Sequence, residues 1–362
     1  MADSAGSSME ARAQRGRRQR LASLCQRAGL MPLGRAVRQL LRHDVRILAY
    51  HRVLESAEPD AFVFDPELIS ASAGMFRKQM QLVRRRFHPL RFDELLDCID
   101  RGRAPPPRSV LVTFDDGYDD NYRIAWPILQ EAGLSAMFFV STGHIESGAP
   151  YAYDWLAHML TVAPEGELAL PEIGLQARLH GPPAARREVV AEVLDRLKAL
   201  DAPAQEALIG RLEEVLAMPR AGGHDDCRPM SWDQLRRMHA SGMEIGSHGV
   251  NHRMLAKLSP ALIEEELAGS RQAIGREIGV HAQVLSYPVG GRDAYDGTVV
   301  DIARACGYRL ACSYISGTSG LEPANRYGMP RLPVERHMDL GWFEAMLSLP
   351  EVFSHTSRNR GH

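Results

Sequence analysis

The stretch Val110-Leu111-Val112-Thr113-Phe114-Asp115-Asp116-Gly117 decides the fold of this 362-residue chain. An apolar run that ends in two carboxylates and a glycine is typical of a buried parallel strand followed by a polar turn. Much later, Met243-Glu244-Ile245-Gly246-Ser247 leads in the same way into His248, and His252 follows four residues on. Because functional residues of parallel β/α folds gather at the carboxyl ends of the strands, we expect both motifs at one mouth.

Short apolar runs alternate with helical patterns across the central part of the chain, which indicates parallel β/α units. Strands are expected at residues 46–53, 109–114, 135–140, 243–247, 283–287, 308–313 and 329–334. Helices are expected between them, for example at residues 75–87, 121–132, 232–240, 260–278 and 298–305. The main domain is therefore predicted at residues 45–347.

Three regions depart from this alternation. Residues 144–228 are an expected insertion, with a hairpin near 167–179 and a charge-rich helical stretch at 186–218. This insertion is either a lid beside the site or a solvated structural element. Residues 1–44 form a basic arm, and residues 348–362 are expected to form a polar tail.

The basic arm is the most uneven feature of the charge distribution. The chain has a formal net charge of -2, yet residues 11–46 contain ten arginines and a single acid, Asp44. Leucines recur among these arginines at helical spacing, so short amphipathic helices or disorder are expected. The arm either packs on the domain or attaches to an anionic membrane surface. The acidic remainder does not suggest a nucleic-acid-binding core.

Composition excludes several classes of protein. A hydrophobic fraction of 45% with 24% charged residues is ordinary for a globular domain, and no apolar run is long enough to span a bilayer. The sequence from Met1 to Arg20 lacks the apolar core of a secretory signal. We therefore expect the protein in the cytoplasm, at the inner face of the membrane if the arm binds lipid.

One aspartate with His248 and His252 has the chemistry of a metal site. Mixed oxygen and nitrogen ligands suit Zn²⁺ and are acceptable to Co²⁺, Mn²⁺ or Ni²⁺. Three protein ligands leave open positions, as a catalytic site requires, and the second aspartate remains available for proton transfer. A lone Asp-Asp-Gly string is often an ordinary turn, but the pairing with two histidines at another strand end favours a site.

These residues also carry a family resemblance. Thr113-Phe114-Asp115-Asp116-Gly117 and Ser247-His248-Gly249-Val250-Asn251-His252 resemble the first two motifs of the polysaccharide deacetylases, the NodB-homology group or carbohydrate esterase family 4. The resemblance extends over about residues 45–347. It implies a distorted (β/α)₇ barrel, here with an inserted helical segment, in which Asp115 is the general base and Asp116, His248 and His252 bind the metal.

The third family motif is altered in this chain. Ser286-Tyr287-Pro288-Val289-Gly290-Gly291-Arg292 keeps the proline but lacks the arginine two places before it. The resemblance implies that the segment Tyr287-Pro288-Val289 contacts the substrate, with the backbone N–H of Val289 polarising its carbonyl. The arginine that would orient Asp115 must come from elsewhere; Arg331 is the first candidate and Arg292 the second.

The family's C-terminal Leu-x-His, which supplies the general acid, is not evident. Ala49-Tyr50-His51-Arg52-Val53 instead resembles the Tyr-His-x-Ile/Val strand end of exopolysaccharide deacetylases such as those acting on poly-N-acetylglucosamine. His51 is therefore the predicted proton donor, although a lone histidine is more often a packed or surface residue.

The predicted activity is metal-dependent removal of an N-acetyl group from an amino sugar, in a polysaccharide or its glycolipid precursor. One alternative is another metal amidohydrolase or an O-acetyl esterase on the same barrel. The other is a catalytically impaired carbohydrate-binding protein, which the two altered motifs favour. Tyr118, Trp155 and Trp232 could face sugar rings, or could serve only in packing.

Overall fold

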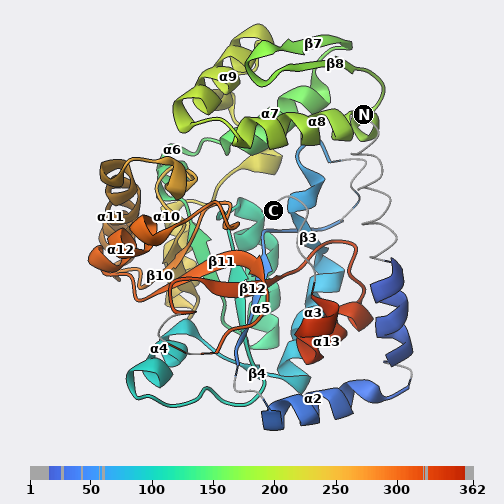
Figure 1. Cartoon of the computed structure of the whole chain (residues 1–362), viewed down its shortest axis with the longest axis vertical. Coiled ribbons are helices and arrows are strands. Elements are labelled where there is room, and N and C mark those ends of the chain that lie inside the picture. The colour runs from blue at the N-terminus through green and yellow to red at the C-terminus, as the bar shows by residue number, and fades with distance from the viewer. Residues whose placement is uncertain are drawn as a thin grey trace.

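A closed parallel barrel forms the centre of the molecule (Figure 1). The computed structural model describes residues 16–25, 28–41, 44–56, 58, 62–320, 322 and 325–354. Within this part of the chain, seven strands run in the order β1-β12-β11-β10-β9-β6-β5, and β5 pairs again with β1 to close the ring. The strands are β1 (Arg46–Tyr50), β5 (Ser109–Phe114), β6 (Met137–Val140), β9 (Glu244–Ser247), β10 (Val284–Ser286), β11 (Leu310–Ser316) and β12 (Met329–Pro333). The predicted (β/α)₇ barrel is confirmed.

All seven barrel strands lie where the apolar runs predicted them, but the first is shorter than expected. The run at residues 46–53 breaks at His51, because β2 (Arg52–Leu54) leaves the barrel and pairs with β3 (Ile69–Ser72) in a separate sheet. The break is held by two hydrogen bonds: the His51 N–H donates to Ser70 Oγ at 2.9 Å, and the Val53 N–H donates to Asp120 Oδ1 at 3.1 Å.

Helices surround the barrel. The helix α13 (Leu340–Ser348) lies at a position for which no helix was predicted, whereas five others lie where they were expected: α3 (Ala73–Arg86), α5 (Trp126–Ala132), α10 (Trp232–Ala240), α11 (Pro260–Ile278) and α12 (Gly297–Ala305). One differs in detail, because the helix expected at 121–132 opens with a π-helical turn at Asn121–Ala125 before α5 begins. Asn121 is buried there and donates from Nδ2 to the carbonyl oxygen of His51 at 2.8 Å. This turn therefore ties the helix to the end of β1.

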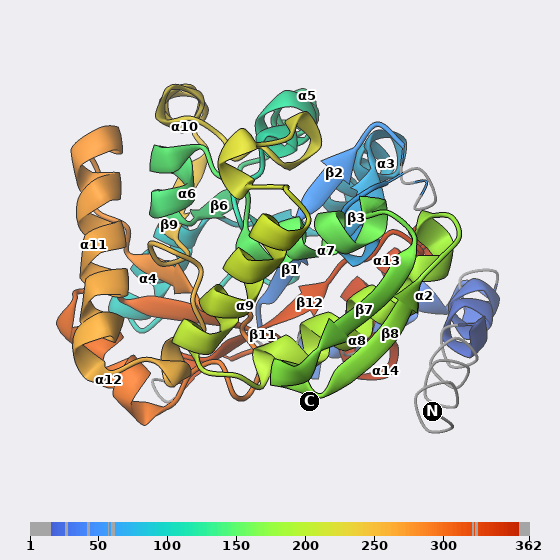
Figure 2. The same cartoon turned by 90° about the horizontal axis from the view of Figure 1, so that it is seen from above.

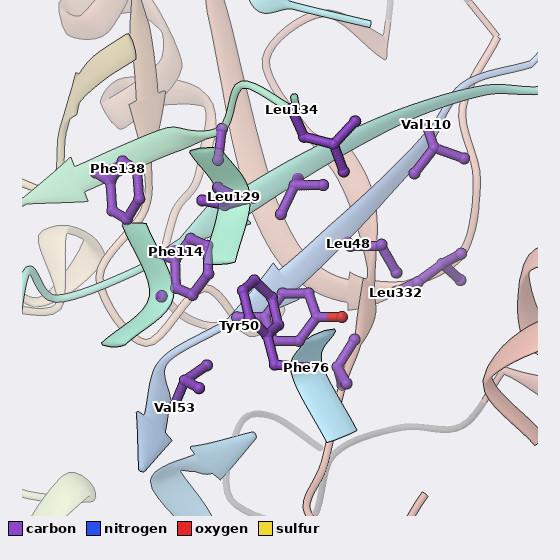
Figure 3. Close-up of a cluster of buried hydrophobic side chains, with 14 of the residues drawn as sticks. Leu48, Tyr50, Val53, Phe76, Val110, Phe114, Leu129, Leu134, Phe138 and Leu332 are labelled. Carbon is purple, nitrogen blue, oxygen red and sulfur yellow. The ribbon is translucent and has the colours of Figure 1, made fainter. Parts of the chain in front are cut away.

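Aromatic packing fixes the strand that carries the two aspartates (Figure 3). The ring of Phe114 stacks between Tyr50 and Phe138, at centroid distances of 5.3 and 4.8 Å, and meets Phe76 of α3 edge-on. These four side chains are fully buried. Large aromatic side chains contribute most of the apolar area in such a cluster. Because Phe114 directly precedes Asp115, this packing sets the point at which the chain turns into the site.

A short helix closes the amino-terminal opening of the barrel. After the two-residue strand β4 (His88–Pro89), α4 (Phe92–Asp100) lies toward the lower end of the molecule in Figure 1, and it buries Phe92, Leu95, Leu96 and Ile99. Buried side chains of α4 and of the barrel strands near their starts form one apolar cluster. Its members are Val45, Ile47, Leu90, Phe92, Leu95, Leu96, Ile99, Leu111, Met137, Phe139, Val284, Leu310, Cys312 and Met329. The polar end of the barrel is therefore the opposite one.

The insertion builds a second layer with its own core. It comprises α6 (Thr142–Ser147), α7 (Ala152–Val162), the hairpin β7 (Gly166–Leu170) and β8 (Leu175–Leu179), α8 (Pro183–Lys198) and α9 (Ala202–Val215). The hairpin, α8 and α9 lie where the sequence predicted them, whereas α6 and α7 were not predicted. Leu156, Leu160, Val193, Leu197 and Ile209 are among its buried apolar residues. Figure 1 shows this layer above the barrel, and Figure 2, seen from above, shows it covering part of it.

The basic arm packs on the main domain in its described part. Residues 16–25 and α2 (Leu30–Leu41) are helical, and α2 contacts α13. Arg35 pairs with the buried Glu344, and Arg38 pairs with Asp44 and Glu351. Residues 1–15 of the arm lie outside the described residues. Among the described helices, none has the length and apolarity needed to cross a bilayer.

The polar tail begins later than residue 348, where it was expected. A further helix, α14 (Pro350–Phe353), follows α13, and the Phe353 side chain is only 1% exposed. Its carbonyl oxygen accepts a hydrogen bond from Trp342 Nε1 at 3.0 Å. The expectation was wrong for this segment because two apolar residues among polar ones are too weak a pattern to signal a helix. Residues 355–362 lie outside the described residues.

Candidate active site and metal centre

The barrel strands bring the predicted site residues together at their carboxyl ends. Asp115 and Asp116 follow β5, His248 follows β9 and His51 follows β1. Side chains that are far apart in the sequence thus share one mouth, at the end of the barrel opposite α4. Asp115, Asp116, His51 and His248 are all at most 3% exposed.

Asp116, His248 and His252 converge on one point. Asp116 Oδ1 lies 3.4 Å from His248 Nε2 and 3.3 Å from His252 Nε2, and the three atoms lie within 4.8 Å of one another. Such spacings suit three ligands around a single cation at ordinary bond lengths of about 2.0–2.2 Å. This group could hold a divalent metal.

The orientation of His248 supports this fit. Its Nδ1 lies 2.7 Å from the carbonyl oxygen of Ser286, which can only accept, so Nδ1 carries the proton. Nε2 therefore presents its lone pair to the site, where it is buried and makes no hydrogen bond. Metal-binding histidines commonly use their second ring nitrogen in this way.

Three site residues have a backbone conformation that non-glycine residues rarely adopt. Asp116, His252 and Val289 have φ angles of 74°, 55° and 65°. Left-handed conformations of this kind carry a local cost and persist only where surrounding contacts hold them. The Tyr151 hydroxyl donates to the carbonyl oxygen of Asp116 and so holds the first of these turns.

Glu266 holds the turn between the two histidines, a role that sequence reasoning missed. Its Oε2 accepts from the backbone N–H groups of Val250 and Asn251 at 2.7 and 2.8 Å, and Oε1 accepts from the Asn251 side chain at 2.9 Å. Glu266 lies in α11, where three consecutive glutamates form an ordinary helical pattern. Only its 3% exposure distinguishes it, and the sequence does not report exposure.

Arg331 forms a bidentate ion pair with Asp115. The guanidinium NH1 donates to Oδ1 at 2.8 Å and NH2 donates to Oδ2 at 2.7 Å, with both side chains buried. Burial by itself raises the pKa of Asp115, but the charge and hydrogen bonds of Arg331 outweigh it and hold the pKa well below its usual value. The carboxylate is therefore ionised at neutral pH. Arg292, the second candidate, lies exposed on the turn after the third motif.

The rest of the Arg331 guanidinium is also fixed. Its Nε donates to the carbonyl oxygen of Ser313 at 2.8 Å, and NH2 donates to Ser286 Oγ at 3.0 Å. Ser286 stands two places before Pro288, where the resemblance implies an arginine. In this chain Ser286 occupies that position, and its Oγ accepts a hydrogen bond from Arg331, which lies in β12.

His51 approaches Asp115 from the neighbouring strand. Its Nε2 lies 3.8 Å from Asp115 Oδ2, and its ring lies 5.3 Å from that of Tyr314. Tyr314 also lies under the Arg331 guanidinium, at 5.3 Å from the ring centroid, and its backbone N–H donates to the carbonyl oxygen of Gly290 at 2.7 Å. Tyr314 thus contacts three parts of the site. Sequence reasoning missed it because the predicted strand ended at residue 313.

A pocket opens beside these residues. It is lined by Asp65, Leu68, Asp116, Tyr118, Tyr151, Tyr153, Asp154, Leu194, Lys198, His252 and Val289. Of the three aromatic candidates, Tyr118 lies in this lining. Trp155 belongs to the insertion core, where its Nε1 donates to the Met218 carbonyl at 2.9 Å, and Trp232 packs on the main core. Packing was the correct interpretation for the two tryptophans.

The third motif contributes to this pocket through Val289. The Tyr287 side chain instead stacks on Tyr295 at 4.1 Å and donates to the Tyr327 carbonyl at 2.8 Å. Pro288 lies beside Gly249, whose added Cβ would come within 3.8 Å of the proline ring. Tyr287 and Pro288 therefore shape the turn, and Val289 is the member of the three that faces the pocket.

Gly290 offers a test of this turn. An added Cβ would lie 2.8 Å from both Cβ and N of Tyr314, and the φ angle of +68° disfavours any other residue. Gly290→Ala should destabilise the protein by at least roughly 1–2 kcal/mol from the left-handed backbone alone. Gly297→Ala is the control, because nothing lies within 4 Å of its added Cβ and it begins α12. Urea unfolding of both variants with equal midpoints would contradict this account.

Comparison with known proteins agrees with this geometry. The family model described as "Polysaccharide deacetylase" matches residues 102–165 and 180–311, more than half of the chain. The protein named "Putative polysaccharide deacetylase YxkH", from Bacillus subtilis (strain 168), is 21% identical over 252 residues, which cover 69% of this chain and 60% of that protein. The match thus spans less than two thirds of that relative's length.

Solved structures share the fold at low sequence identity. The Streptococcus pyogenes deacetylase PplD in complex with acetate has a TM-score of 0.56 at 19% identity, covering 86% of this chain and 99% of its own. The de-N-acetylase from Aggregatibacter actinomycetemcomitans has a TM-score of 0.52 at 17% identity, covering 82% and 97%. IcaB from Ammonifex degensii has a TM-score of 0.52 at 18% identity, covering 84% and 97%. With the matched family model, these findings show that the chain belongs to the polysaccharide deacetylase family.

Proposed function

We propose that this deacetylase is a metal-dependent hydrolase of the N-acetyl group of an N-acetylglucosamine-type sugar, in a polysaccharide or its glycolipid precursor. One observation carries the proposal. Asp115, paired with Arg331, lies beside both the three converging side chains and the His51 ring. A base, an acid and a set of metal ligands around one point are the groups that amide hydrolysis requires.

The metal would be held by Asp116, His248 and His252. Zn²⁺ is the expected ion, with Co²⁺, Mn²⁺ or Ni²⁺ acceptable to the same donor set. When bound, such a cation polarises an acyl oxygen and makes water easier to deprotonate. This assignment is a proposal that rests on the distances and on the orientation of His248.

The chain's own residues would perform the proton transfers. The ionised Asp115, held in place by Arg331, takes a proton from the attacking water. The backbone N–H of Val289 donates to the developing oxyanion. His51, whose Nε2 lies 3.8 Å from Asp115 Oδ2, donates its proton to the departing amine. Base and acid thus approach from neighbouring strands, β5 and β1.

The structure bears on the alternatives. An ester leaves as an alcohol and needs less help from an acid than an amine does, so a buried His51 beside Asp115 favours an amide substrate over an O-acetyl ester. The idea of an impaired enzyme rested on the missing arginine and the missing Leu-x-His histidine. Arg331 and His51 both lie beside Asp115, where they could serve these two roles, and this weighs against that alternative.

Asp115→Asn tests the proposed activity. The wild-type protein, loaded with Zn²⁺, should release acetate from N-acetylglucosamine oligomers, whereas the variant should be slower by about 10²–10⁴-fold because its amide cannot accept the proton. Small N-acetylated amides and O-acetylated sugars serve as comparison substrates. Wild-type turnover on the small amides alone would instead support the amidohydrolase alternative.

His51→Ala and His248→Ala separate proton donation from metal binding. His51→Ala should lower kcat by about 10²–10⁴-fold while the affinity for Zn²⁺, measured by competition with a chelating dye, stays unchanged. His248→Ala should weaken that affinity strongly, since one of three ligands is lost. Near-normal turnover by His51→Ala would show that another group is the acid.

We further propose that the basic arm contacts an anionic membrane surface at its cytoplasmic face. Leu21, Leu24, Leu33 and Val37 are 44–64% exposed, although they are large and apolar. Arg17 and Arg20 are exposed near the first two of them. Apolar side chains beside arginines are the composition of interfacial helices. Arg35 and Arg38 do not contribute, because they are paired with acids of the main domain.

Liposome flotation tests the membrane contact. Leu24→Asn with Leu33→Asn should reduce binding to vesicles that contain phosphatidylserine, because the apolar face would become polar. The matched control is Val215→Asn with Leu262→Asn, which changes two exposed apolar residues elsewhere. Equal partitioning of the wild type and both double variants would exclude this role for the arm.

A further inference from the structure

The insertion supplies one wall of the pocket that contains the site. Tyr151 is the N-cap residue of α7, Tyr153 and Asp154 belong to its first turn, and Leu194 and Lys198 lie one turn apart near the end of α8. The lining also includes Asp116, His252 and Val289 from the barrel loops. A molecule that reaches the reacting groups from this side must therefore touch the insertion.

The aromatic residues of this wall are held by their hydroxyl groups. Tyr151 donates to the Asp116 carbonyl, Tyr153 donates to Gln205 Oε1 at 2.6 Å, and Tyr118 donates to Asp154 Oδ2 at 3.3 Å. The hydroxyls are thus engaged with protein. The rings of Tyr118 and Tyr151 are also covered, since they are only 1% and 4% exposed, so the partly exposed ring of Tyr153 is the one that remains for a ligand. Fixed aromatic rings are suited to packing against the apolar faces of a sugar.

The polar part of the wall combines a cation with carboxylates. Lys198 is one of three lysines in the whole chain and the sole cation in the described lining. It lies close enough to Asp65 to act on that carboxyl group electrostatically. An ammonium group has three donors and a carboxylate up to four acceptor positions, so the two can serve a ligand as well as each other. Lys198 can donate a hydrogen bond to one hydroxyl group of a ligand, and Asp65 can accept one from the neighbouring hydroxyl group.

The net charge of the pocket bears on the class of ligand. Asp154 is buried and Asp65 partly buried in the lining that contains Lys198, and Arg52, which lies 4.0 Å from Asp154 Oδ2, is engaged with Asp120 at 2.9 Å. Apart from the proposed metal ligands Asp116 and His252, the lining would present a phosphate or carboxylate group with two carboxylates and one ammonium. Neutral hydroxyl groups would meet donors and acceptors without that repulsion.

We propose that the insertion forms a recognition subsite for the uncharged ring of the N-acetylated sugar, with Lys198 binding its hydroxyl groups and the Tyr153 ring packing on its face. This inference rests on the proposed deacetylase function and assigns a role to residues 144–228. Any phosphate of a glycolipid precursor would then lie outside this pocket. Lys198 is a specificity-determining residue and takes no part in the proton transfers.

Lys198→Met tests the subsite, because methionine keeps the apolar stem and favours the helix while removing the ammonium. KM for N-acetylglucosamine oligomers should rise about tenfold or more, as expected for a lost charge-assisted hydrogen bond, with kcat within about twofold. Zn²⁺ affinity should not change. Lys78→Met, on the exposed surface of α3, is the matched control and should leave KM and kcat unchanged. An unchanged KM in Lys198→Met would overturn the proposal.

Binding measured without turnover distinguishes this proposal from the proposed function. In the Asp115→Asn background, calorimetry with the same oligomers should show affinity that Lys198→Met weakens about tenfold or more. If the oligomers bind in a Lys198-dependent way but the wild type releases no acetate, the proposed deacetylase activity is rejected and the subsite is kept. If the wild type releases acetate but binding does not depend on Lys198, the subsite is rejected and the activity is kept. N-acetylglucosamine should inhibit the wild type at least as well as N-acetylglucosamine 1-phosphate, and stronger inhibition by the phosphate would overturn the uncharged-ring assignment.

Discussion

The buried ion pair between Asp115 and Arg331 is the interaction on which the rest of the site depends. Two charges removed from water are tolerated only when they pair well and every remaining polar atom is satisfied. Here the guanidinium meets both carboxylate oxygens and also Ser313, Ser286 and Thr113. The pair joins β5 to β12, the two strands that flank β1 in the closed barrel. His51, at the end of β1, is thereby brought beside the carboxylate.

The site is assembled from strained turns that more distant contacts hold in place. Asp116, His252 and Val289 all have positive φ angles, and none of them is glycine. Glu266 and Tyr151 hold the first two of these turns through hydrogen bonds to the backbone. Hydrogen bonds from outside these turns therefore fix the backbone that carries Asp116 and His252.

The barrel and the insertion have separate roles in the proposed function. The strand ends of the barrel provide the reacting groups, and the insertion, with a core of its own, provides a wall of aromatic rings and one ammonium. A division of this kind allows recognition to change without disturbing the chemistry. Tyr151 connects the two parts, because it lines the pocket and its hydroxyl donates to the backbone carbonyl of Asp116.

The sequence by itself determined the seven strands and the two motifs, because both are local patterns: an apolar run predicts a buried strand, and the residues after it must lie at the mouth. It also indicated Arg331 and His51, each from its place near a strand end. Tertiary structure alone decided the rest. It selected Arg331 over Arg292 as the partner of Asp115, 216 residues away along the chain, and it placed the supports Glu266, Tyr314 and Tyr151, which belong to elements with no motif of their own. Such contacts depend on how the barrel closes and on where the insertion packs, and neither is encoded in the spacing of neighbouring residues.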